Sequence, residues 1–399
     1  MREYVYYNFS YLDVINKKIV KNCYFRITDG VFSEIDDLTN LSEEEKKLGI
    51  NLNNAYVTPG LFNIHTHVLS TPLANPASLN YENQGKFALR GYRHLMQYLE
   101  TGVVFVRDLN GRKQAEIELR DAINEGILIG PHYQVCRQCL TMTGGHGSNT
   151  GYECDGIDEC RKGARVQLKY GADFLKVMAT GGINSPGSER SSQLSEEEIR
   201  AIVEIAHTAG KKTAVHAHGT QGIKNAVKAG IDSVEHGTYL DDEALELMKM
   251  RGTALVPTLS VSSALTDKNA DLSGVLPFQI EKSRKAHEAH IKSFKAAWNA
   301  GILIGLGTDG GTPLNPHTDT WREFKAMTDL GCNAFDVLAV GTINSAKIVG
   351  VDDNLGSIEK GKFADFVTFE KNPIDDITEL SRPTATYLGG RRFIKAELI

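Results

Sequence analysis

The sequence lacks long apolar runs and any excess of basic charge. No stretch approaches the roughly 20 consecutive apolar residues that cross a bilayer. The first twenty residues, MREYVYYNFSYLDVINKKIV, are interrupted by polar side chains too often to form a signal-peptide core. A net charge of -6 provides no basic surface for nucleic acid or an anionic membrane. We therefore expect a cytoplasmic protein that binds neither nucleic acid nor a membrane.

Cysteine is also scarce, with six residues in 399. So few thiols in so long a chain do not form a disulfide framework. Cys136 and Cys139 form a CxxC pair that could be half of a zinc site. The other candidate pair, Cys154 and Cys160, is separated by five residues rather than the roughly two to four of such sites. We expect reduced thiols without a functional role.

A GxGxxG motif after an early strand is absent, which argues against a dinucleotide-binding fold. From residue 59 onward, apolar strand-like runs instead alternate with amphipathic helical stretches. The runs are LFNIHTHV (61–68), VVFVRDL (103–109), HYQVC (132–136), DFLKVM (173–178), KTAVHAH (212–218), DSVEH (232–236), ALVPTL (254–259) and LIGLGTD (303–309). Eight strand–helix units in about 290 residues predict an α/β protein, a (β/α)8 TIM barrel.

The two ends of the chain have a different pattern. Short strand-like runs occur at 4–7, 24–27 and 31–35, and the charged segment 42–50 is typical of a solvated loop or a short helical turn. After residue 350 the pattern returns to strands, with ADFVTF (364–369) and a hairpin around Gly389 and Gly390. We predict that residues 1–57 and 351–399 form one small β-sandwich beside a barrel of residues 58–350.

Side chains that can bind metal follow the predicted barrel strands, at whose carboxyl ends such barrels build their active sites. His65 and His67 are two residues apart, so on a strand both imidazoles face the same side. Imidazole and carboxylate donors suit zinc or a similar divalent ion. The six candidates, taken in chain order, are His65, His67, Lys176, His216, His236 and Asp309.

Lys176 differs from the other five because an ammonium group has no lone pair. Burial beside metal ions would favour the neutral amine. A neutral amine can take up carbon dioxide and become a carbamate, which is a bidentate oxygen ligand. A core ion-pair role for Lys176 is the structural alternative.

These motifs resemble the amidohydrolase superfamily, and within it the group of metal-dependent prolidases, dipeptidases and carboxypeptidases related to imidazolonepropionase. The resemblance spans about residues 25–385 and is carried by PGLFNIHTHV, GADFLKVMATGG, VHAHG, VEHG, GLGTDGG and LGSIEKGKFADFVTFEKNP. One position departs from the family pattern. Asn63 stands where an acidic residue usually precedes the first motif histidine.

The resemblance implies a barrel with a small β-sandwich and a binuclear zinc centre. His65 and His67 would bind one metal, and an N6-carboxylated Lys176 would bridge both. His216 and His236 would bind the second metal, while Asp309 would complete the first. Related enzymes suggest a homo-oligomer.

The chemistry implied is hydrolysis of an amide by a metal-bridging hydroxide. Asp309 would take the proton of the water and pass it to the departing amine. The expected substrate is a small molecule, a dipeptide or an N-acyl amino acid, as for an Xaa-Pro dipeptidase or a carboxypeptidase-like enzyme. The expected released residue is a C-terminal amino acid such as proline or a basic residue. A cyclic amidohydrolase of the imidazolone or hydantoin type, or a deaminase, would use the same centre. A non-catalytic binding protein on this scaffold is a remote alternative, because none of the ligands is missing.

Further residues are candidates for substrate contact. The resemblance suggests His146, and His218 shares a strand face with His216. Tyr239 could stabilise an oxyanion. Arg190, within a glycine-rich segment, could belong to a lid, and we expect His317 at the pocket rim. The other histidines are interpreted as surface or core residues: His94, His132, His207, His287 and His290.

Overall fold

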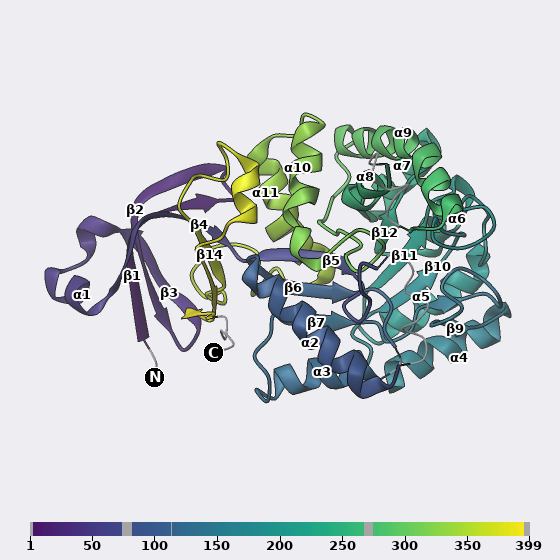
Figure 1. Cartoon of the computed structure of the whole chain (residues 1–399), viewed down its shortest axis with the longest axis horizontal. Helices are drawn as coiled ribbons and strands as arrows, with labels where there is room; N and C mark the ends of the chain where they lie inside the picture. The colour runs from purple at the N-terminus through teal and green to yellow at the C-terminus, as the bar shows by residue number, and fades with distance from the viewer. Residues whose placement is uncertain (1–2, 74–81, 113, 267–273, 395–399) are drawn as a thin grey trace.

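The computed structural model describes residues 3–73, 82–112, 114–266 and 274–394 (Figure 1). Seven parallel strands correspond to seven of the eight predicted runs: β5 (Leu61–Thr66), β6 (Val103–Asp108), β7 (His132–Val135), β10 (Leu175–Met178), β11 (Thr213–Ala217), β12 (Ser233–His236) and β13 (Ala254–Val256). In the described part of the chain, no helix is long and apolar enough to cross a membrane.

The barrel closes through backbone hydrogen bonds at two places. The Asp173 amide donates to the Val135 carbonyl at 2.8 Å, which joins β10 to β7. The eighth run, 303–309, forms only one isolated bridge on each side rather than a regular strand. It nevertheless lies between β13 and β5, because Ile64 N donates to Leu306 O at 2.8 Å and Leu255 N donates to Leu303 O at 2.9 Å. The predicted TIM barrel is confirmed.

Helices follow the strands and cover the outside of the barrel (Figure 1). α5 begins at the predicted capping box, since Ser195 accepts from the Glu198 amide and Glu198 accepts from the Ser195 amide. The helices of this part of the chain are α2 (Gln84–Glu100), α3 (Ala115–Asn124), α4 (Gly156–Lys169), α5 (Glu196–Thr208), α6 (Thr220–Ala229), α7 (Asp242–Arg251), α8 (Leu259–Thr266), α9 (Pro277–Asn299), α10 (Trp321–Asp329), α11 (Ala334–Ala339) and α12 (Ser345–Val349).

Both ends of the chain contribute to a seven-stranded sheet with the order β16-β15-β14-β4-β1-β2-β3. Its strands are β1 (Glu3–Asp13), β2 (Lys18–Thr28), β3 (Val31–Asp37), β4 (Ile50–Pro59), β14 (Phe366–Phe369), β15 (Ala385–Leu388) and β16 (Arg391–Arg392). Figure 1 shows the purple and yellow strands side by side at one end of the molecule. Segment 42–50 contains the short helix α1 (Glu43–Leu48).

This sheet curls until its far edge meets the C-terminal segment. Phe32 N donates to Lys362 O at 2.9 Å, and the enclosed core consists largely of aromatic rings. Phe366 stacks on Tyr387 at 4.2 Å and meets Phe25 edge-on at 5.7 Å. The small β-sandwich built from both termini is therefore also confirmed.

Two short strands were not predicted. β8 (Leu140–Thr141) pairs with β10, and β9 (Tyr152–Glu153) pairs with β8. They extend the sheet of β10 to β13 at its β10 edge and flank the loop that carries His146. All six cysteines are free, and the Sγ atoms of Cys154 and Cys160 lie 3.4 Å apart.

Candidate metal centre

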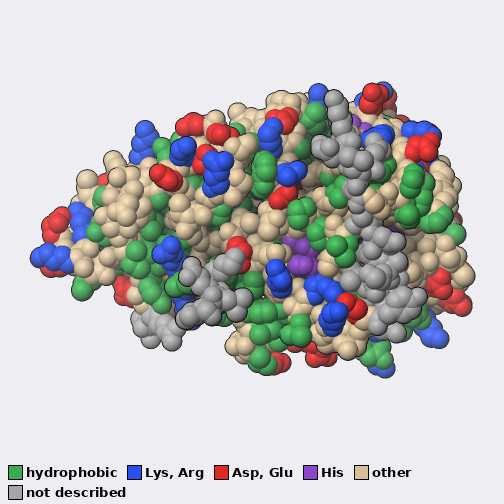
Figure 2. Space-filling view, viewed as in Figure 1, with side chains coloured by type: hydrophobic (Ala, Val, Ile, Leu, Met, Phe, Trp, Pro, Cys, Tyr) green, Lys and Arg blue, Asp and Glu red, His purple; other side chains and the backbone are tan. Residues whose placement is uncertain are grey.

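The predicted metal ligands meet at the carboxyl ends of the barrel strands, and histidine side chains are visible near the middle of the face in Figure 2. Among the described residues, two groups of three side chains could each hold a metal ion. Every side chain of a group offers one ligand atom, and the three ligand atoms of that group lie within 4.8 Å of one another. The two groups and Lys176 line one cavity of about 230 Å³.

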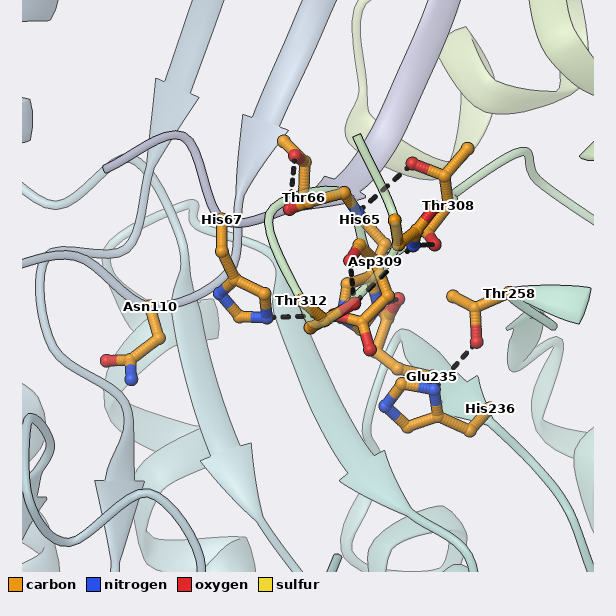
Figure 3. A network of polar contacts seen from close by, with 12 residues as sticks. His65, Thr66, His67, Asn110, Glu235, His236, Thr258, Thr308, Asp309 and Thr312 are labelled. Atoms are coloured by element: carbon orange, nitrogen blue, oxygen red, sulfur yellow. Dashed lines mark hydrogen bonds and ion pairs between the residues drawn. The ribbon is translucent and has the colours of Figure 1, made fainter. Parts of the chain in front are cut away.

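The first group consists of His65, His67 and Asp309 (Figure 3). Nε2 of His67 lies 2.9 Å from Oδ1 of Asp309, and Nε2 of His65 lies 3.4 Å from the same oxygen. Burial raises the pKa of Asp309, but the two neighbouring imidazoles lower it further, so the pKa lies well below its usual range. The site therefore presents an ionised carboxylate beside two imidazoles.

The second group consists of His216, His218 and His236, all buried, with ring centroids 4.7 Å apart in each pair. Nε2 of His216 lies 3.1 Å from the Gly181 carbonyl oxygen, and Nδ1 of His236 lies 2.7 Å from the Thr258 hydroxyl. A metal-binding histidine commonly donates its other N–H to such a partner. Burial lowers the pKa of all three imidazoles, so neutral rings with available lone pairs are expected.

Lys176 is the third feature of the centre. It lies on β10, is 1% exposed, and its Nζ atom has no hydrogen-bond partner among the described residues. Burial lowers its pKa to about 8. The amine of Lys176 is thus buried without a partner, and it lines the same cavity as the two groups of imidazole and carboxylate donors. This arrangement fits a centre for divalent cations in which the lysine is converted to an anionic ligand.

An ion pair beneath the centre was missed by the sequence analysis. Oε2 of Glu235 lies 2.7 Å from Nδ1 of His65, and Oε1 accepts from Arg107 at 2.9 Å. Arg107 also donates from Nε to the Ile64 carbonyl at 2.7 Å, and Ser233 donates to Glu235. The sequence does contain a signal for this pair, because Arg107 lies inside the strand-like run VVFVRDL and Glu235 lies inside the run DSVEH.

Asn63, the departure from the family pattern, connects β5 to the last run of the barrel. Its amide nitrogen donates to the Thr308 hydroxyl at 2.8 Å and to the Thr320 hydroxyl at 3.3 Å. Its carbonyl oxygen accepts from the amides of Thr308 and His65. A neutral amide, which both donates and accepts, therefore links the backbone of His65 to the residue before Asp309.

Two of the five substrate-contact candidates, His146 and His218, line the cavity. The His146 ring stacks on His216 at 4.1 Å, and its Nδ1 lies 2.5 Å from the Ser185 hydroxyl. Gly182 makes room for this ring, since a Cβ there would lie 2.3 Å from Cε1 of His146. His218 is held by Thr238, whose hydroxyl lies 2.7 Å from its Nδ1.

Tyr239 and Arg190 lie beside the cavity rather than among its lining residues. The guanidinium of Arg190 packs 4.0 Å from the ring centroid of Tyr239, whose hydroxyl donates to Glu189 at 3.1 Å. His317 is buried behind the centre instead of at the rim. Its Nε2 lies 3.2 Å from the His67 carbonyl oxygen, and its ring stacks on His94 at 4.0 Å.

The remaining histidines have structural contacts. His132 pairs with Asp365 at 2.7 Å and His207 pairs with Asp232 at 2.8 Å. Ser262 lies 3.2 Å from Nδ1 of His287. His290 is buried at the cavity wall, where its Nε2 lies 2.7 Å from the Pro257 carbonyl oxygen.

Comparison with known proteins agrees with this geometry. The model of the amidohydrolase family matches residues 56–393. Ochratoxinase of Aspergillus niger is 31% identical over 376 residues, covering 84% of this chain and 75% of the relative. Imidazolonepropionase of Clostridium tetani is 23% identical over 382 residues, covering 90% of this chain and 86% of that protein.

Among solved structures, a Xaa-Pro dipeptidase with methionine bound in its active site superposes with a TM-score of 0.92. It is 30% identical, and the match covers 98% of this chain and 100% of that one. The family match, the relatives and the arrangement of donors all agree: this chain belongs to the amidohydrolase family.

Proposed function

We propose that this chain is a zinc-dependent hydrolase that releases the C-terminal amino acid from a dipeptide or an N-acyl amino acid. The observation that carries the proposal is the convergence of two three-residue donor groups and an unpaired buried lysine on one cavity. The imidazole and carboxylate donors suit zinc. The similarity to a Xaa-Pro dipeptidase supports the choice of substrate class.

We assign His65, His67 and Asp309 to one cation and His216 and His236 to the second. Lys176, once neutral, would add carbon dioxide and lose a proton, and the resulting carbamate would supply an anionic oxygen ligand to the centre. Bound cations supply the positive charge that lowers the pKa of water and polarises the scissile carbonyl. Most of the donor side chains are buried, which strengthens these electrostatic interactions.

The chain's own residues then move the proton. Asp309, held 2.9 Å from His67, accepts the proton of the attacking water. The oxygen of that water bonds to the carbonyl carbon, the carbon–nitrogen bond breaks, and Asp309 returns the proton to the leaving amine. His146 and His218, which line the cavity, orient the substrate around the reacting carbonyl.

The test is hydrolysis by zinc-reconstituted protein of a library of dipeptides and N-acyl amino acids. Asp309→Asn is expected to lower kcat by about 10²–10⁴-fold, the range for a missing general base. Failure to cleave any member of the library would refute the proposal. Metal content measured on both proteins separates lost catalysis from lost metal.

A cyclic amide is the second candidate substrate, favoured by the similarity to imidazolonepropionase. Imidazolones and hydantoins belong in the same assay plate, together with a measurement of ammonia release to detect deamination. If a ring substrate is turned over faster than every dipeptide, the proposed function changes from peptidase to cyclic amidohydrolase. Binding of these compounds without any turnover would indicate a non-catalytic protein.

A further inference from the structure

The cavity has two chemically different sides. The metal-binding side chains form its base, and the loops after β6 and β7 add polar groups such as Asn110 and Thr150. Another part of the lining is apolar. It is formed by Ile183, Val261, Leu265 and Ala286, which we call the apolar wall.

The apolar wall is built on elements that pack firmly together. Val261 and Leu265 lie four residues apart on α8, so they share one helix face, and Ala286 lies on α9. Leu265 is 2% exposed and packs in a cluster with Val275 and Ile280, against which Ile183 also packs. Three of the four wall residues therefore lie on two packed helices, and Ile183 is added by the loop after β10.

The side chains of Ser262, Ser283 and His290, near this wall, have partners within the protein, whereas Oδ1 of Asn184, next to Ile183, has none among the described residues. The Ser262 hydroxyl donates to the Leu259 carbonyl at 3.0 Å, and Ser283 donates to the Ser262 carbonyl at 3.5 Å. His290 contacts the carbonyl oxygens of Pro257 and His236 at 2.7 and 3.1 Å. No carboxylate, ammonium or guanidinium group belongs to the apolar wall. Cations do lie nearby, because Lys282 donates to the Gly182 and Ser185 carbonyls on either side of Ile183, and Arg112 lines the same cavity. Among the described lining residues the one carboxylate is Asp309 of the metal centre, so a substrate ammonium group placed at the wall would be desolvated without an ion-pair partner there.

We propose that the apolar wall is the side-chain subsite of the hydrolase and that its preferred substrates release a bulky apolar amino acid such as leucine, methionine or phenylalanine. This inference rests on the proposed function and narrows it to one substrate class. Methionine bound in the active site of the similar Xaa-Pro dipeptidase has a side chain of the same character. The same wall disfavours a basic leaving residue, which would find no carboxylate partner there.

The test compares kcat/KM of the zinc-reconstituted full chain for a matched series of dipeptides, Gly-Xaa, that differ only in the last residue. Gly-Leu, Gly-Met and Gly-Phe are expected to exceed Gly-Ala at least about tenfold, because each buried methylene favours the complex. Gly-Lys is expected to fall at least about a hundredfold below Gly-Leu. Hydrolysis of Gly-Lys as fast as that of Gly-Leu, or faster, would overturn the subsite assignment while leaving the proposed hydrolase activity intact. No cleavage of any dipeptide or N-acyl amino acid would instead overturn the proposed function.

A charge-introducing variant tests the wall itself. Val261→Asp should lower kcat/KM for Gly-Leu at least about tenfold and raise it for Gly-Lys, because a carboxylate then faces the side-chain subsite. Ser263→Asp, on the exposed side of the same helix, is the matched control and should leave the ranking unchanged. Far-UV circular dichroism and metal content must match the wild type in both variants. An unchanged substrate ranking in a folded, metal-loaded Val261→Asp protein would overturn the proposal.

Discussion

Nδ1 of His65 lies 2.7 Å from Oε2 of Glu235, in a part of the barrel where both side chains are buried. This contact directs Nε2 of His65 toward Asp309, at 3.4 Å. Although burial raises the pKa of Glu235, Arg107 and His65 lower it to about 2. A permanently ionised Glu235 therefore selects the tautomer of His65 that carries its proton on Nδ1.

Replacing Glu235 should weaken metal binding without destroying the site. We expect Glu235→Gln to lower zinc affinity about 10–100-fold, since a residue that orients a ligand usually contributes this much. Glu235→Ala should in addition destabilise the fold by about 3–5 kcal/mol, because Arg107 would stay buried without its partner. Competition with a chelator and urea denaturation measure the two effects. Glu243→Gln, at an exposed position, is the control.

His216 and His218 differ in their predicted roles although both belong to the same donor group. We expect His216→Ala to lose one metal ion per chain, and His218→Ala to retain the metal while raising KM. The reason is the resemblance, which assigns the ligand to the position of His216. Elemental analysis and steady-state kinetics on both variants test it. Full metal content in His216→Ala with loss in His218→Ala would reverse the assignment.

Glu323 anchors the helix that carries the apolar wall. Its carboxylate accepts from the amides of Leu259 and Ser260, at 2.8 and 2.7 Å, at the start of α8. Glu323→Ala leaves two buried N–H groups unpaired and should cost about 2 kcal/mol or more. Because α8 then shifts, KM for the preferred substrate should rise more than kcat falls. Glu323→Gln should retain most of the wild-type stability and a KM close to that of the wild type. Asp329→Ala, on α10 like Glu323, should change neither the stability nor KM.

The ion pair between His132 and Asp365 makes stability depend on pH at the junction of barrel and β-sandwich. Burial lowers the pKa of His132, but the hydrogen bond and charge of Asp365 raise it above its usual value of about 6.5. A raised folded-state pKa contributes stability that is complete below about pH 6.5 and is lost as pH rises through the folded value. Denaturation of His132→Gln and wild type across this range should show a stability difference that shrinks at higher pH. A constant difference would contradict the prediction.

The sequence was most informative where a strand ends in a polar residue. His65, Lys176 and Asp309 could be predicted because each follows an apolar run, and parallel strands in a barrel bring such ends together. The eighth run was correctly located although it forms only isolated bridges, since its residues Ile304 and Leu306 are buried in the core.

Other features depend on contacts that no local pattern reveals. β8 and β9 have two residues each, too few for any periodicity. Glu235 and Arg107 are 128 residues apart, and only the barrel register brings them together. His317 follows a proline in a loop, and the burial of its ring against His94 depends on α2, more than 200 residues earlier in the chain.

The proposed two-metal centre is tested most directly by the number of zinc ions bound per chain after reconstitution in the presence of bicarbonate. Dipeptide hydrolysis is measured on the same samples, for the wild type and for Lys176→Ala. The account predicts two ions and full activity in the wild type. It predicts one ion or fewer in Lys176→Ala, with kcat/KM lowered at least about a hundredfold because a ligand of both cations is lost. Two ions and full activity in Lys176→Ala, or full activity in metal-free wild type, would contradict it.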